Sequence, residues 1–282
     1  MIDLITDLKE RILFHYTDFI AFDGIFAGEG IRLCDIHTMN DKKEMIYFLE
    51  ILEKEICKQL SVDGFEEEIP QAHKLFNQQE IDRKKCTAFA TCFSMLEDDA
   101  AQWERYGMNG RGICIGFNSV ILKEITQEIA ALQPVFYRNS VSDHAHVQLV
   151  VEALENGGVS LREFDNMKGL FDNIYMCSMG FKHPAFKAEK EVRLTTITTG
   201  NGNIRGLGER NYIIMADKIK GYYNLNLRNL CRKKSIKLSD LIRKIIIGPK
   251  SDQSIEVFKS YLSRKGLTGM DDMVVKSDCP LR

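Results

Sequence analysis

Two carboxylates and an arginine recur at every second position in one late segment of the chain. The segment reads Glu189-Lys-Glu191-Val192-Arg193-Leu194. Side chains two residues apart on a β-strand share a face, so Glu189, Glu191 and Arg193 are predicted to form one row. Adjacent carboxylates raise each other's proton affinity, and a following arginine counters this effect. The row can orient a carboxylate as a hydrogen-bond acceptor; the alternative is an exposed strand face with alternating charges.

An imidazole near the start of the chain is the second candidate. His15 lies in the run Phe14-His15-Tyr16-Thr17, at the predicted end of a short strand that leads into a helix. Thr17 or Asp18 can cap that helix, and the free amides of a helix N-terminus favour anionic ligands. The alternative is a half-buried histidine whose hydrogen bonds are made by the backbone.

A third group combines a hydroxyl with two aromatic rings. Ser94 ends an apolar strand, and Trp103 and Tyr106 follow on a short predicted helix. Residues three apart share a helix face. Trp103 and Tyr106 are therefore predicted to lie side by side, although both rings can equally belong to the core, which is the common position of large aromatic side chains. Ser94 can bond a neighbouring catalytic residue or cap the next turn.

Other polar patterns favour structural interpretations. Asn40 or Asp41 followed by Glu44 is typical of the N-cap of a long helix. His144 and His146 lie in a helical stretch where residues two apart diverge, so no metal site is expected there.

A local excess of positive charge lies between residues 228 and 244. It comprises Arg228, Arg232, Lys233, Lys234, Lys237, Arg243 and Lys244. Such a basic cluster can hold the phosphate backbone of a nucleic acid, although a solvated loop is the default interpretation. The chain as a whole has a formal net charge of -2, which gives no general attraction to nucleic acid or to an anionic membrane.

Composition indicates an ordinary globular protein. Of the 282 residues, 44% are apolar and 28% are charged. The acidic start lacks the features of a secretion signal, and the apolar runs are far shorter than a membrane span. The eight cysteines contain no CxxC pair, as expected for reduced thiols. We expect a cytoplasmic protein without membrane contact.

Apolar periodicity predicts strands interrupted by helices of unequal length. Strands are expected at residues 12–16, 31–34, 87–95, 113–117, 134–137, 191–198, 212–215, 245–247 and 273–275. Helices are expected at residues 19–26, 41–60, 66–82, 100–106, 141–155, 161–179 and 254–265. Regular strand–helix alternation is missing, so we expect one α+β domain over residues 1–282, with helical insertions at about 41–82 and 141–179.

Several short motifs, taken in order, resemble a bacterial family of unknown function, DUF2971, over nearly the whole chain. They are His15-Tyr16-Thr17, Asn40-Asp41-x-x-Glu44, Phe93-Ser94 with Trp103-x-x-Tyr106-Gly107, Gly112-Ile113-Cys114-Ile115-Gly116-Phe117, Phe186-x-x-Glu189-x-Glu191-x-Arg193, and Ser277-x-x-Pro280-Leu281-Arg282. Their shared order carries the resemblance, which names no activity.

A further similarity is to ADP-ribosyltransferases. Those enzymes present, in chain order, a His or Arg on an early strand, a strand with Ser and Thr, and a late strand with Glu-x-Glu. The corresponding residues here are His15, the segment 91–94, and Glu189-x-Glu191. The resemblance implies a core of mixed sheets with inserted helices. The middle strand departs from the family because it lacks the Ser-Thr-Ser pattern.

This resemblance implies that NAD is a substrate. Glu191 would accept a hydrogen bond from the 2′-hydroxyl of the nicotinamide ribose and stabilise the oxocarbenium-like sugar. Glu189 would position or deprotonate the acceptor, His15 would hold the ribose or pyrophosphate, and Ser94 would brace Glu191. Trp103 or Tyr106 would stack on nicotinamide. The implied NAD-binding set is His15, Tyr16, Thr17, Ser94, Trp103, Tyr106 and Arg193.

We therefore expect ADP-ribose transfer from NAD to a macromolecule, with nucleic acid as one candidate, in a toxin or phage-defence setting. An antitoxin or another defence-system protein would be the partner. Two alternatives stay open: a non-catalytic module that binds a nucleotide or nucleic acid, and a hydrolase that acts on NAD or, with a metal, on a phosphodiester. The enzyme hypotheses require His15 and Glu191 to meet in one cleft.

Overall fold

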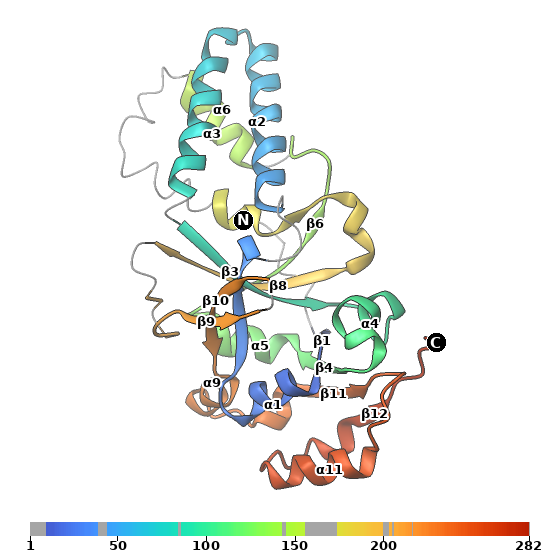
Figure 1. Ribbon diagram of the computed structural model, residues 1–282. Coiled ribbons are helices and arrows are strands. Elements are labelled where there is room, and N and C mark those ends of the chain that lie inside the picture. The colour runs from blue at the N-terminus through green and yellow to red at the C-terminus, as the bar shows by residue number, and fades with distance from the viewer. Residues whose placement is uncertain are drawn as a thin grey trace.

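Ten strands form one large sheet around which the rest of the chain is arranged (Figure 1). They lie within the residues that the computed structural model describes, which are 10–38, 44–83, 86–142, 145–155, 174–199, 203–204, 206–215 and 217–281. Helices cover the sheet, and the α+β class predicted from the sequence is confirmed. In the described part of the chain, no helix is both long and apolar enough to span a membrane.

The sheet is mainly antiparallel. Its strands are β1 (Ile12–Thr17), β2 (Ile31–Asp35), β3 (Cys86–Ser94), β4 (Ile113–Asn118), β5 (Ala131–Pro134), β8 (Glu191–Thr199), β9 (Asn211–Ile214), β10 (Ile219–Leu225), β11 (Ile242–Ile247) and β12 (Val274–Lys276). The main order is β12-β11-β4-β1-β3-β2-β10-β9, and β8 joins β3 to β5. A separate parallel pair consists of β6 (Phe136–Tyr137) and β7 (Phe181–Lys182).

The sheet forks at β3. On one edge, the last residue of β3, Ser94, lies opposite Phe14 of β1. The other edge of β1 pairs with β4. On the same edge of β3 as β1, β2 pairs further back, at Phe89 and Ala90. No described strand pairs with residues 91–93 on that edge, whereas the other edge pairs with β8 along its whole length. The gap between β1 and β2 is the position of the candidate site.

Two groups of helices bury two separate apolar clusters. The main cluster, which contains Phe22, Phe89, Phe117, Leu230 and Phe258, packs under α1 (Phe19–Ala27), α5 (Ser119–Thr126), α9 (Leu227–Lys233), α10 (Leu238–Leu241) and α11 (Ile255–Arg264). The second cluster is formed mainly by α2 (Glu44–Asp63), α3 (Ile69–Arg83) and α6 (Ala145–Glu155), which stand above the sheet in Figure 1. These last helices fall within the two stretches expected as helical insertions.

The segment 228–244 differs from its expected loop structure. It forms most of α9, all of α10 and the start of β11. Leu227, Leu230 and Cys231 are buried in the main cluster. The exposed Arg232 and Lys233 follow them and form the outer side of an amphipathic helix. The sequence pattern also predicts neither α5 nor β10. Asn40, Asp41 and residues 161–173 lie outside the described residues, so the expected N-cap and most of the expected helix at 161–179 are not described.

A carboxylate after β3 holds the C-terminal segment against the sheet. Asp98 adopts a left-handed backbone conformation with φ of 50°. Its carboxylate accepts hydrogen bonds from the Trp103 indole at 2.7 Å, the Ser277 hydroxyl, and the amides of Asp278 at 2.9 Å and Cys279 at 3.1 Å. One side chain thus satisfies four donors from two distant parts of the chain.

We expect Asp98→Ala to lower the free energy of unfolding by about 3 kcal/mol, because several partly buried donors lose their acceptor. Urea denaturation measures the change. Asp278→Ala is the matched control, since its exposed side chain leaves the backbone amide in place. Equal stability of Asp98→Ala and the control would show that the carboxylate does not hold the segment.

Candidate functional site

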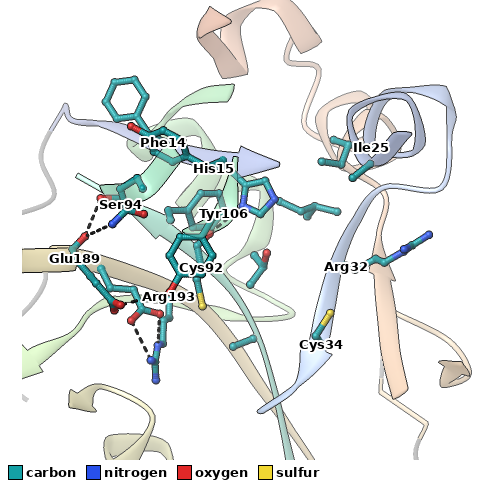
Figure 2. A pocket seen from close by; sticks show the side chains of 18 of the residues that line it. Phe14, His15, Ile25, Arg32, Cys34, Cys92, Ser94, Tyr106, Glu189 and Arg193 are labelled. Atoms are coloured by element: carbon teal, nitrogen blue, oxygen red, sulfur yellow. Dashed lines mark hydrogen bonds and ion pairs between the residues drawn. The ribbon is translucent and has the colours of Figure 1, made fainter. Parts of the chain in front are cut away.

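A cavity of about 480 Å³ lies at the fork of the sheet (Figure 2). Its walls come from β1, α1, β2, β3, β8 and β10, from the helix α4 (Ala100–Tyr106), and from the 3-10 helix η5 (Pro184–Glu189) with β7 before it. Its volume is within the usual range of ligand pockets. His15 and Glu191 both line it, so the structure brings the early imidazole and the late carboxylate into one cleft.

The imidazole of His15 has a defined tautomer. Nδ1 lies 2.9 Å from the carbonyl oxygen of Cys92, and a carbonyl only accepts hydrogen bonds, so Nδ1 carries the hydrogen. Burial lowers the pKa of His15 below 6.5, against the opposing effect of the Cys92 carbonyl. The ring is therefore neutral at pH 7, and Nε2 remains as a hydrogen-bond acceptor.

Glu191 is a buried carboxylate that is ionised at pH 7. Arg193 contacts both of its oxygens, with Nε at 2.7 Å from Oε1 and Nη2 at 3.0 Å from Oε2. Lys182 Nζ lies 3.2 Å from Oε2, and the Cys92 thiol also donates to the carboxylate. Burial opposes ionisation, but the charges of Arg193 and Lys182 outweigh it and hold the pKa of Glu191 at about 2.

Glu189 reaches the same place from a different element. The row of three residues on one strand is wrong for Glu189, because β8 begins at Glu191 and Glu189 ends the preceding 3-10 helix. The left-handed Lys190, with φ of 43°, makes the turn between them. Lys182 nevertheless bridges the two carboxylates, since its Nζ lies 2.7 Å from Oε2 of Glu189.

The face shared by Glu191 and Arg193 is buried. Their exposed fractions are 6% and 1%, which contradicts the alternative of a solvated strand face. Val192 and Leu194 point the other way into the main cluster. The strand alternation predicted from the sequence is therefore confirmed from Glu191 onward.

Ser94 supports the loop that carries Glu189. Its hydroxyl donates to the backbone carbonyl of Glu189 at 2.8 Å and accepts from the amide of Leu96 at 3.1 Å. Ser94 is also the ladder partner of Glu191. Ser94 therefore contacts the backbone of one candidate catalytic residue, Glu189, and adjoins Glu191 through strand pairing, while the Glu191 carboxylate is held by Arg193.

The two aromatic residues of α4 have different positions. Trp103 is fully buried and packs edge-on against Tyr16, with ring centroids 4.9 Å apart. It does not line the cavity, so its expected stacking on a ligand is wrong and the core interpretation is correct. Tyr106 is 40% exposed and lines the cavity. Its hydroxyl lies 3.4 Å from Glu189 Oε1, and burial together with the Glu189 charge raises its pKa to about 12.

The residues next to His15 hold the strand in place. The Tyr16 hydroxyl donates to the carbonyl of Leu96 and accepts from the amide of Asp99, so its polar end is occupied although the residue borders the cavity. Thr17 does not line the cavity. Asp18, the second of the two expected caps, accepts from the amide of Ala21 at 2.6 Å and begins α1.

Lys182 is the main site residue that the sequence does not reveal. It lies on β7, is 6% exposed and contacts both Glu189 and Glu191. No helix or strand period relates it to either carboxylate, since the turn through η5 determines its position. Arg105 is also unexpected; its Nη1 lies 2.9 Å from Glu189 Oε1.

The basic cluster is spread over several elements. Arg228 donates to the Phe26 carbonyl at 3.0 Å, Lys234 lies 2.8 Å from Glu128, and Lys244 contacts Glu97. Arg232 and Lys233 are exposed at the end of α9. Among the described residues, no group of three or more His, Cys, Asp or Glu side chains is arranged to hold a metal ion.

The depressed pKa of Glu191 predicts a specific dependence of stability on pH. Its ionised form stabilises the fold above pH 4.5, and this contribution is lost as the pH falls toward 2. Between pH 4.5 and pH 2, we expect the free energy of unfolding of Glu191→Gln to fall by about 3 kcal/mol less than that of the wild-type protein. Urea denaturation between these two pH values measures this loss. Glu50→Gln, on an exposed position of α2, should keep the wild-type pH dependence; an unchanged dependence in Glu191→Gln would contradict the assignment.

Comparison with known protein families shows a similarity over part of the chain. Residues 102–194 match the model of a family described as a protein of unknown function, DUF2971. This segment runs from α4 into β8 and supplies Arg105, Lys182, Glu189, Glu191 and Arg193. Neither a curated protein nor a solved structure matches the chain. The similarity to DUF2971 that the motifs predict is thus confirmed for the part of the chain that carries the carboxylate network.

Proposed function

We propose that this chain is an ADP-ribosyltransferase-like enzyme that uses NAD as a substrate and transfers its ADP-ribose to a macromolecule. One observation supports the proposal above all: a neutral imidazole with an available Nε2 and an ionised, buried carboxylate line the same cavity. The first can accept a hydrogen bond from a ribose hydroxyl. The second carries the negative charge that a developing oxocarbenium ion requires.

The proposed reaction breaks the bond between C1′ of the ribose and the nicotinamide nitrogen. Nicotinamide leaves with the bonding electron pair, and positive charge develops on the sugar. Glu191 stabilises that charge, and its hydrogen bond to the 2′-hydroxyl orients the ribose. The acceptor then bonds to C1′ and loses its proton to Glu189.

The Cys92 thiol is the group that the substrate would displace. A carboxylate has about four acceptor positions, and Arg193, Lys182 and Cys92 occupy those of Glu191. A thiol is a weak donor, whereas the bonds from the two cations are charge-assisted and strong. Exchange of the thiol for a ribose hydroxyl leaves the ion pairs intact.

We expect the wild-type protein to release nicotinamide from NAD, and Glu191→Gln to release it at least about 100-fold more slowly, because the amide cannot supply the negative charge. Chromatography of labelled nicotinamide measures the rate. Glu50→Gln removes an equivalent charge from the surface of α2 and should retain the wild-type rate. No release from the wild-type protein, tested with nucleic acid and protein acceptors, would overturn the enzyme proposal.

His15 can be tested with two amides of different length. Asn at this position keeps a donor near the Cys92 carbonyl but has no group at the position of Nε2; Gln places its amide nearer to that position. We expect His15→Asn to raise the KM for NAD about 10-fold, as for the loss of one buried hydrogen bond, and His15→Gln to raise it less. Steady-state kinetics of nicotinamide release measure both. Equal KM values in the two variants would show that Nε2 does not contact the substrate.

The acceptor that we propose is a macromolecule, with nucleic acid as the first candidate, and the setting is that of a toxin or a phage-defence protein restrained by an antitoxin or a defence-system partner. The exposed Arg232 and Lys233 on α9 offer charge for a phosphate backbone.

A second candidate is a non-catalytic module that binds a nucleotide in the same cavity. Its support is the saturated hydrogen bonding of Glu191, which a purely structural ion pair would also show. NAD binding without nicotinamide release, unaffected by Glu191→Gln, would favour it. A hydrolase is distinguished by its products: free ADP-ribose indicates cleavage of NAD by water, and chelator-sensitive cleavage of nucleic acid indicates a metal-dependent nuclease.

A further inference from the structure

The end of the cavity opposite the carboxylates is formed by two neighbouring strands. On β2, Arg32 and Cys34 point to the cavity side, while Leu33 is buried on the other side. On β10, Lys220 also lines the cavity, two residues before Tyr222, which is the ladder partner of Cys34. Figure 2 shows Arg32 and Cys34 across the cavity from Glu189 and Arg193, with His15 between the two sides.

The cations at the β2 and β10 end of the cavity are more exposed and less firmly paired than Arg193 and Lys182 at the carboxylate end. Arg193 and Lys182 are 1% and 6% exposed, and both are held by Glu191. The Arg32 side chain is 37% exposed. Among the residues that the structure describes, the carboxylate it contacts is that of Glu29 at 3.3 Å, whose side chain is 60% exposed. Such an exposed pair contributes little, so the guanidinium can exchange it for a ligand.

Arg32 and Lys220 both lie near the side chain of Cys34. Burial raises the pKa of the Cys34 thiol, and the charges of Lys220 and Arg32 both oppose this rise. Both cations are therefore close to one side chain on the cavity wall. An arginine fork beside a lysine is a common arrangement for phosphate oxygens, because the fork binds two oxygens at once and the ammonium adds a point charge.

We propose that Arg32 and Lys220 bind the phosphate groups of the ligand, so that the cavity holds a nucleoside diphosphate moiety with its phosphates at β2 and β10. The ribose that reacts then lies toward His15 and Glu191. This inference rests on the proposed function, which supplies the nucleotide as the ligand. It adds that Arg32 and Lys220 select a phosphorylated ligand.

Calorimetric titration with ADP and with adenosine tests the proposal. We expect ADP to bind the wild-type protein at least about 10-fold more tightly than adenosine, and Arg32→Gln and Lys220→Gln each to weaken ADP about 10-fold, as for the loss of a charge-assisted hydrogen bond. Adenosine affinity should not change. Arg32→Lys keeps the charge without the fork and should recover part of the ADP affinity.

Lys218→Gln is the matched control, because Lys218 lies two residues before Lys220 and pairs on the surface with Asp217 at 4.0 Å. It should bind ADP like the wild type. Equal affinities of the wild type for ADP and adenosine, absence of ADP binding, or equal weakening of ADP and adenosine in the cavity variants would overturn the phosphate assignment. ADP binding that depends on Arg32 and Lys220, without nicotinamide release, would uphold this assignment and overturn the enzyme proposal.

Discussion

The burial of Glu191 imposes the main constraint on this structure. An ionised carboxylate away from water is very unfavourable unless opposite charges and hydrogen bonds surround it. Arg193 supplies a two-pronged contact from the same strand, and Lys182 arrives from a distant element and also contacts Glu189. The turn between β7 and β8 therefore has to bring the ammonium between two carboxylates, and the fold around the cavity follows from this requirement.

The fork of the sheet leaves a cavity beside these charged side chains. Because β1 pairs with β3 at Ser94 and β2 pairs with it at Phe89 and Ala90, room remains beside residues 91–93 for side chains and a ligand. The Nδ1 of His15 donates to the carbonyl of Cys92, and this bond fixes the orientation of the ring. The imidazole and the carboxylate consequently face one cavity although they are far apart in the sequence.

Local patterns in the sequence predict most elements and several site residues, but not their three-dimensional combination. Alternation along β8 places Glu191 and Arg193 on one face, and the order of motifs indicates His15. Lys182 and Arg32 carry no such signal, because their roles depend on the turn before β8 and on the pairing of β2 with β10. Trp103 illustrates the reverse error: a ring beside a candidate site is buried against Tyr16, since its helix packs on β1.

The open edge of β3 has a consequence for how occupancy of the cavity can be observed. Amides in a fully paired sheet exchange their hydrogens with solvent only when the sheet opens. The carbonyl of Cys92 faces the open edge, and the N–H of the same residue points to that edge as well, so a molecule in the cavity would shield this amide while β8 pairs with those of Thr91 and Phe93. Deuterium uptake at this short stretch would then report a bound molecule even when the melting temperature of the protein hardly changes.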